Sequence, residues 1–174
     1  MARATTQTLS PAEVTRFLDA ARETDYFVYF ATLLHTALRR RELPALRWRN
    51  LDLENATVTV VETAYNPGNG KYVIREPKTP QSRRTVMLPN SLVELPEVYR
   101  ADWELPRIQL AVSLKADDFV LIRSDGSLIN PSVLTLAFRR IAGKAGLRDI
   151  RMHDSRDAHA TLMLKGWCPS KGCL

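Results

Sequence analysis

Three groups of residues, far apart in the sequence, have side chains that could hold an anion and act on it. Arg39 follows a long apolar stretch, Lys78 lies in a Pro-Lys-Thr triplet beside a turn-rich segment, and His153 precedes Arg156 by three residues. A guanidinium group keeps its proton and can bind an anion through two parallel hydrogen bonds. A lysine ammonium or an imidazole can also move a proton. These residue types are suited to a site that binds a polyanion.

Basic residues are unevenly distributed along the chain. The 174 residues include 25 Lys and Arg against 19 Asp and Glu, a net charge of +6. Residues 90–125 have a net charge of −3, whereas the rest of the chain has +9. A single basic cluster is usually a solvated helix face, but a fold can bring several clusters onto one surface, which favours a polyanionic partner. The clusters are Arg39, Arg40, Arg41, Arg47 and Arg49; Lys71, Arg75, Lys78, Arg83 and Arg84; and Arg139, Arg140, Lys144, Arg148, Arg151 and Arg156.

The composition excludes several classes of protein. Hydrophobic residues make up 45% of the chain and charged residues 25%, values typical of a soluble folded domain rather than a disordered or collagen-like chain. Residues 26–38 form the longest uncharged stretch in the first half, shorter than the ~20 residues that a membrane helix needs. Cys168 and Cys173 lack the spacing and partners of a metal site. We therefore expect a cytoplasmic protein with no membrane contact, metal or cofactor.

Helix signals occur at both ends of the chain. Ser10 and Glu13 form a capping box, with Pro11 at the first helical position. The short helix expected at residues 41–48 tolerates Pro44 only in its first turn. Helices are also predicted over residues 26–38, over residues 91–112 with interruptions at Pro96 and Pro106, over residues 130–145 with Gly146 as the stop, and after Asp154.

Strand signals occupy the middle of the chain. Residues 57–61 are β-branched, residues 66–70 are rich in Asn, Pro and Gly, and residues 71–76 follow, which together predict a β-hairpin with a long loop. Residues 84–88 supply a third strand that ends at Pro89. Residues 119–122 form a short apolar run.

At these motifs the chain resembles the catalytic domain of the tyrosine recombinases, the phage integrase family. The family's first box, approximately T-G-L-R-x-G-E-L-x-x-L-x-W, corresponds to residues 36–48. Its P-K-T lysine corresponds to Lys78, and its H-x-L-R-H-x-x-A-T box to residues 153–161. The resemblance covers about residues 9–165. It implies an α+β fold that is mainly helical, with a small three-stranded antiparallel sheet, of the DNA breaking-rejoining type. The first box is matched at Thr36, Leu38, Arg39, Glu42, Leu43, Leu46 and Trp48, and the last at His153, Arg156, Ala160 and Thr161.

The resemblance implies a role for each matching residue. Arg39 and Arg156 would bind the nonbridging oxygens of the attacked phosphodiester, where negative charge gathers. Lys78 would protonate the departing 5′-oxygen, and His153 would hold the phosphate or move the nucleophile's proton. The expected partners are double-stranded DNA and other recombinase protomers, and no metal or cofactor is required. Further contacts to DNA are expected from Arg40, Arg83 and Arg84.

The sequence departs from the family pattern at several positions. The family's nucleophilic tyrosine follows the last box, but all five tyrosines of this chain precede that box and none matches the nucleophile's motif. Asp157 replaces the second histidine of the box and could compete with phosphate for Arg156. Other departures are Ala37 and Arg41 at positions where the family usually has glycine, Pro44 where it often has leucine, and Ser155 in place of leucine.

These departures leave three functional interpretations. The first is a recombinase catalytic domain, truncated before its tyrosine, that binds DNA but is unable to cleave it alone. The second is a strand-cleaving subunit whose tyrosine comes from a partner chain, and the third is a degenerate remnant with no DNA role. We expect a disordered tail over residues 1–8, the truncated catalytic domain over residues 9–165, and an atypical tail over residues 166–174.

Overall fold

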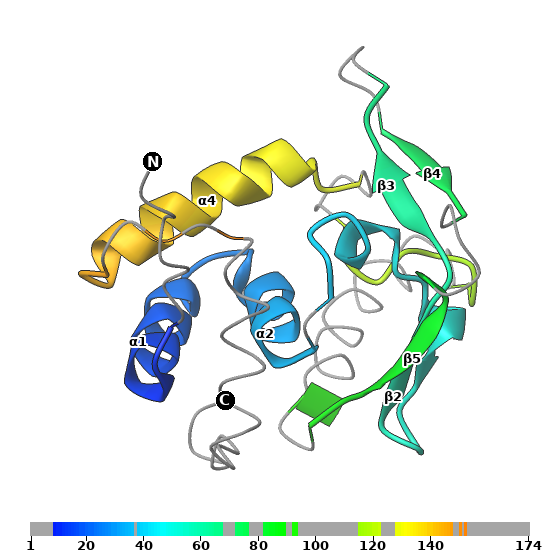
Figure 1. The fold of residues 1–174 in the computed structure, drawn as a ribbon, viewed down its shortest axis with the longest axis horizontal. Coiled ribbons are helices and arrows are strands. Elements are labelled where there is room, and N and C mark those ends of the chain that lie inside the picture. The colour runs from blue at the N-terminus through cyan, green and yellow to red at the C-terminus, as the bar shows by residue number, and fades with distance from the viewer. Residues whose placement is uncertain are drawn as a thin grey trace, which may run out of the picture.

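In the computed structural model, the described part of the chain consists of helices and two small sheets around one hydrophobic core (Figure 1). Helices α1, α2 and α4 lie on one side, and strands β1 to β5 on the other. The structure describes residues 9–36, 38–67, 72–76, 82–89, 92–93, 115–122, 128–147, 150 and 152. The helices expected over residues 91–112 and after Asp154 fall mostly or wholly outside these residues.

Local capping signals set the start of the first helix. Helix α1 spans Pro11–Ala21. The Ser10 backbone N–H donates to Glu13 Oε2 at 2.8 Å, and the Glu13 N–H donates to Ser10 Oγ at 3.4 Å, so the predicted capping box is confirmed. Its reciprocal bonds satisfy two backbone groups that a helix start would otherwise leave open.

Two more α-helices lie where the sequence predicts them. Helix α2 spans Phe27–Thr36 and helix α4 spans Pro131–Lys144. The side chain of Asn130 caps α4 by accepting from the Ser132 N–H at 2.7 Å. Gly146, with φ of +64°, ends the helix in the left-handed conformation that favours glycine.

The prediction of a helix over residues 41–48 is wrong. Two short 3₁₀ turns, Leu43–Ala45 and Trp48–Asn50, stand there instead, with Leu46 extended between them. The backbone of this segment bonds to a distant stretch of chain: Val120 N–H donates to Leu46 O at 2.8 Å, and Trp48 N–H donates to Asp118 O at 3.1 Å. These long-range bonds use backbone groups that a continuous helix would have paired internally.

The strands form two antiparallel sheets rather than one hairpin plus a third strand. A three-stranded sheet has the order β1-β2-β5, and β3 pairs with β4 in a separate two-stranded sheet. The predicted strand of residues 57–61 corresponds to β2, which ends at Val60 and belongs to the three-stranded sheet. The next strand, β3, is the one that forms the hairpin with β4. The strands are β1 at Leu51–Asp52, β2 at Thr57–Val60, β3 at Thr63–Tyr65, β4 at Val73–Arg75 and β5 at Arg84–Met87.

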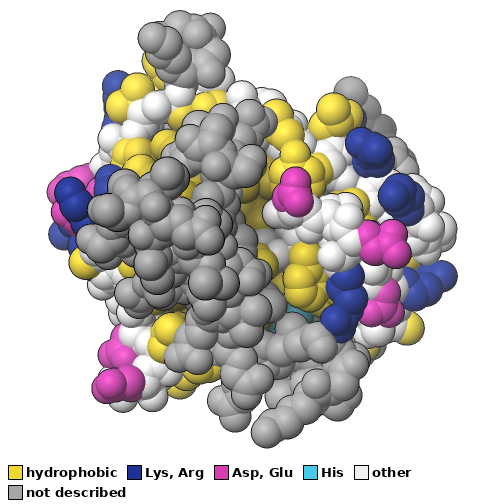
Figure 2. Space-filling model, turned by 180° about the vertical axis from the view of Figure 1, so that it is seen from behind, with side chains coloured by type: hydrophobic (Ala, Val, Ile, Leu, Met, Phe, Trp, Pro, Cys, Tyr) yellow, Lys and Arg dark blue, Asp and Glu magenta, His cyan; other side chains and the backbone are white. Residues whose placement is uncertain are grey.

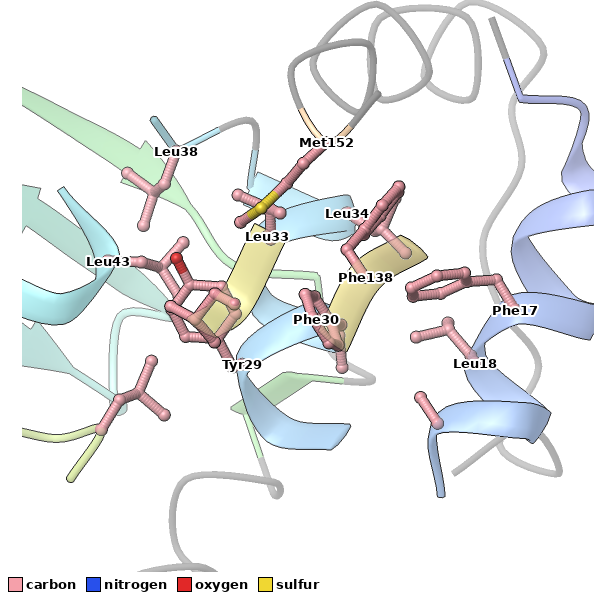
Figure 3. Packing of buried hydrophobic residues seen from close by; sticks show 14 of the residues in the cluster. Phe17, Leu18, Tyr29, Phe30, Leu33, Leu34, Leu38, Leu43, Phe138 and Met152 are labelled. Carbon is pink, nitrogen blue, oxygen red and sulfur yellow. The ribbon is translucent and has the colours of Figure 1, made fainter. Parts of the chain in front are cut away.

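Aromatic side chains join the three helices in the core (Figure 3). Phe17 from α1 lies 4.7 Å from Phe138 of α4 and 5.5 Å from Phe30 of α2, measured between ring centroids. Phe30 also contacts Phe138 at 5.6 Å and Tyr29 at 5.5 Å, both edge to face. Edge-to-face pairs add to the stabilisation from buried apolar area. The cluster fixes α2 and thereby the loop that follows it.

The predicted fold class is confirmed: the chain is mixed α+β, mainly helical, with small antiparallel sheets. Strand β1 was not predicted because two residues carry too little pattern. Among the described helices, none combines the length and apolar character required to cross a bilayer.

The aromatic cluster generates a stability prediction. Phe138→Ala removes a fully buried ring, and we expect a loss of about 3–5 kcal/mol in the free energy of unfolding. Leu136→Ala on the same helix is the control, because Leu136 is 69% exposed and its loss should change stability by about 0.5 kcal/mol or less. Urea denaturation of both variants measures the difference. Equal losses would mean that α4 is not held by this cluster.

Candidate functional site

Arg39 lies in the loop that leaves α2. The backbone turns there, because the Glu42 N–H donates to Arg39 O at 2.8 Å and the Leu43 N–H to the same oxygen at 3.3 Å. Leu38 and Leu43, both buried, anchor the two sides of the turn in the core. The Arg39 side chain is half exposed. The fold thus presents this guanidinium to solvent from a fixed backbone.

A buried carboxylate holds Arg39 in place. The Glu42 side chain is 3% exposed and accepts from the Arg39 backbone N–H at 2.7 Å and from Arg39 Nη1 at 2.8 Å. Arg84, from strand β5, binds the same carboxylate through two parallel bonds, Nη1 to Oε1 at 2.9 Å and Nη2 to Oε2 at 2.8 Å. One carboxylate therefore joins two arginines that are far apart in the sequence.

The electrostatics of this cluster favour an anion. Burial raises the pKa of Glu42, but hydrogen bonds from Arg84 and Arg39 outweigh burial and hold that pKa below its usual range. The bond to Glu42 in turn raises the pKa of Arg84. Two guanidinium groups on one carboxylate leave an excess charge of +1. Within the described residues, Nε and Nη2 of Arg39 have no protein partner, so a ligand can take them.

A cavity of about 360 Å³ opens beside this cluster. Its lining residues come mainly from the loop after α2 and from the β3–β4 hairpin. This hairpin lies at the far side of the molecule from α1 (Figure 1). The cavity's volume falls at the lower end of the range of small-ligand sites. Its lining contains three arginines: the residues are Arg39, Arg41, Glu42, Thr63, Tyr65, Arg75, Glu76 and Ser82.

Arg40 and Arg83, the other residues predicted to contact DNA, have partners other than Glu42. Arg40 Nη1 donates to Thr135 Oγ1 on α4 at 2.9 Å, and Arg83 Nη2 donates to Glu76 Oε2 at 2.8 Å, with all the side chains of the second pair exposed. Lys78, His153 and Arg156 lie outside the described residues. Of the predicted site residues, the structure therefore brings together Arg39 and Arg84, through Glu42.

Part of the first basic cluster stabilises the fold. Arg47 Nε donates to Glu62 Oε2 at 2.6 Å, and its guanidinium lies 4.2 Å from the centroid of the Phe119 ring. Arg49 forms an ion pair with Asp117. Blue and magenta side chains also lie next to one another at the margins of the face in Figure 2. For Arg47 and Arg49, a structural role fits better than a ligand-binding one.

Sequence reasoning missed Glu42 as the link, although Glu42 was visible in the R-x-x-E spacing of the first box. It also missed Arg41 and Arg75 as lining residues of the cavity, for which no local signal exists. As for metals, no group of three His, Cys, Asp or Glu side chains in the described ranges is close enough to hold one.

Comparison with known proteins gives consistent matches. The model of the "Phage integrase family" matches residues 7–171. A tyrosine recombinase XerC-like protein of Caldanaerobacter subterraneus subsp. tengcongensis is 28% identical over 177 aligned positions, which cover 95% of this chain and 45% of that protein. The ICEBs1 integrase of Bacillus subtilis is 24% identical over 159 positions, 88% of this chain and 42% of that protein. The chain therefore spans less than half the length of these two relatives.

Solved structures share the fold. The Tn1549 transposon integrase, solved in complex with transposon right end DNA, superposes with a TM-score of 0.75 and 19% identity, over 98% of this chain and 57% of that one. The XerA recombinase gives a TM-score of 0.70 and 20% identity, over 95% of this chain and 52% of that one.

The shared carboxylate predicts a pH-dependent stability. Glu42→Gln removes the charge that holds two guanidinium groups, and we expect a loss of about 2–3 kcal/mol at pH 7, below the value for a fully buried pair because both arginines are partly exposed. Since the pKa of Glu42 is lower in the folded than in the unfolded state, its stabilisation is present above pH 4.5 and is lost as the pH falls through the folded value.

The measurement is urea unfolding of the wild type and Glu42→Gln at several pH values between 7 and 3. The stability gap should be widest at neutral pH and close in acid. The exposed Glu54→Gln is the control and should show no such gap. A gap that stays constant with pH would contradict the ionised state of Glu42.

Proposed function

Because the chain belongs to the phage integrase family, we propose that it binds duplex DNA as a recombinase catalytic domain, with Arg39 on the phosphate that the family's reaction attacks. The observation that carries this proposal is the half-exposed Arg39 guanidinium, fixed by a buried Glu42 at the lining of a cavity. A preorganised cation of this kind costs little to reorganise when charge builds up on the phosphate oxygens. Glu42 sets its position and Arg84 offsets the charge of Glu42.

The remaining catalytic assignments rest on the sequence motifs. Lys78 is proposed as the general acid for the 5′-oxygen, and His153 and Arg156 as the second side of the phosphate site. Arg84 has a different proposed role from the one expected at first. Its two Nη atoms bind Glu42, so we assign it to positioning Arg39, with Arg40 and Arg83 as the exposed candidates for DNA contact.

The described tyrosines support the proposal that this polypeptide does not cleave DNA alone. The Tyr29 hydroxyl is buried and donates to Arg40 O at 3.1 Å, and burial raises its pKa far above the ordinary value. The Tyr72 hydroxyl is 3.4 Å from Ser132 Oγ, and the ring of Tyr65 lies under Arg75. These three hydroxyls or rings are thus engaged in contacts within the protein. Cleavage would then need a tyrosine from outside these 174 residues.

Other protomers are proposed partners alongside DNA. A λ integrase dimer bound to a core site shares the fold, with a TM-score of 0.60 over 95% of this chain. That assembly supports a role in which several subunits act on one DNA site.

Binding to DNA should be weak, tolerant of sequence and strongly dependent on salt. We expect dissociation constants of about 10⁻⁴–10⁻⁶ M for nonspecific duplex at physiological salt. Arg39→Gln should weaken binding by about tenfold, because one charge-assisted contact is lost, and should lower the slope of log K against log salt by about 1. Fluorescence anisotropy with a labelled duplex from 50 to 200 mM salt gives both quantities. Absence of binding at 50 mM salt would refute the proposal.

The cleavage proposal has its own test. A nicked suicide duplex incubated with the wild-type chain should give no covalent protein–DNA adduct on a denaturing gel. An adduct would contradict the proposal, and substitution of each of the five tyrosines by Phe in turn would then identify the attacking residue. Addition of a family member that carries the tyrosine but lacks its own first-box arginine tests for cleavage in trans.

A further inference from the structure

Two arginines beside Arg39 are brought to the same cavity by strand pairing. The Ala64 N–H donates to Arg41 O at 2.7 Å, which ties the loop after α2 to strand β3. Strand β3 pairs with β4 so that Thr63 lies opposite Arg75. Arg41 and Arg75 consequently line the cavity from two sides, together with Arg39.

The guanidinium groups of Arg41 and Arg75 have no carboxylate partner among the described residues. Both carboxylates in the cavity lining are used by other arginines, since Glu42 binds Arg39 and Arg84, and Glu76 binds Arg83. The Arg75 guanidinium lies 4.8 Å from the centroid of the Tyr65 ring, which supports it by a cation–π contact and leaves its hydrogen-bond donors for a ligand.

The charge of this region is strongly positive. Three arginines line the cavity of about 360 Å³, and two more bind its carboxylates, Arg84 on Glu42 and Arg83 on Glu76. These five guanidinium groups and two carboxylates leave an excess of three positive charges. Like charges held together repel unless an anion lies between them. A backbone phosphate carries a negative charge on two nonbridging oxygens, which can accept the paired donors of guanidinium groups.

We infer that Arg41 and Arg75 bind a second backbone phosphate of the DNA, next to the phosphate proposed for Arg39. This inference rests on the proposed DNA binding and extends it. Arg41 stands where the family pattern usually has glycine, so this contact is a feature of this chain. The contact anchors the DNA strand at the β3–β4 hairpin, while Arg39 holds the reacting phosphate.

A pair of double variants tests the inference. Arg41→Gln with Arg75→Gln should weaken duplex binding by about tenfold or more and lower the salt slope by about 2, one for each lost phosphate contact. Arg16→Gln with Arg22→Gln removes the same charge from α1 and from the residue that follows its last turn. Helix α1 lies on the far side of the molecule from the β3–β4 hairpin (Figure 1), so affinity should change by less than about threefold with the slope unchanged. Both are measured by anisotropy, as for Arg39→Gln.

Equal effects of the two double variants would overturn the inference while leaving the proposed function intact, provided that the wild type binds and Arg39→Gln weakens binding. Thermal unfolding confirms that each variant is folded, and Arg41→Lys with Arg75→Lys, which keeps the charge, should restore the salt slope. In the final experiment, the melting temperature of the wild type and of the Arg41→Gln/Arg75→Gln variant is measured with and without inorganic phosphate at matched ionic strength. If phosphate raises the melting temperature through Arg41 and Arg75 while duplex affinity does not depend on them, the site takes free phosphate and the DNA assignment is wrong.

Discussion

The buried carboxylate of Glu42 is the constraint on which the site depends. An ionised carboxylate loses its hydration when it is buried, and it needs several charge-assisted hydrogen bonds to offset that cost. Glu42 obtains them from the Arg39 backbone and side chain and from both Nη atoms of Arg84. The loop after α2 and strand β5 must therefore meet at this point. The same requirement that fixes the fold locally also fixes the orientation of Arg39.

Features set by neighbouring residues could be predicted from the sequence. The capping box at Ser10 and the Asn130 cap act within one helical turn, so a few consecutive residues are enough to predict where these helices begin. Features set by distant backbone pairing could not. Residues 41–48 have the composition of a short helix, but the bonds of Leu46 to Val120 and of Trp48 to Asp118 replace that helix. Strand pairing likewise separates the β3–β4 hairpin from the three-stranded sheet.

The same division holds for the site. The first box located Arg39, because its neighbours in the sequence are also its neighbours in the loop. The role of Arg84 depends on the register that places Arg84 opposite Val60, since that register carries it to Glu42. Arg47 and Arg49 are paired with Glu62 and Asp117 in a comparable way. The number and spacing of basic residues in the sequence do not distinguish arginines that form ion pairs within the fold from arginines whose donors are open to a ligand.

The net charge of +6 takes a more specific meaning once the carboxylates are placed. Glu42 and Glu76 neutralise part of the charge around the cavity, and without them five guanidinium groups would repel one another in the folded state. With them, the repulsion is small enough for the loop and the hairpin to pack, yet Arg41, Arg75 and the outer donors of Arg39 stay unsatisfied by the described protein groups. In the proposed function, the DNA backbone supplies the missing acceptors. The acidic residues therefore determine where the basic surface is strongest as much as the arginines do.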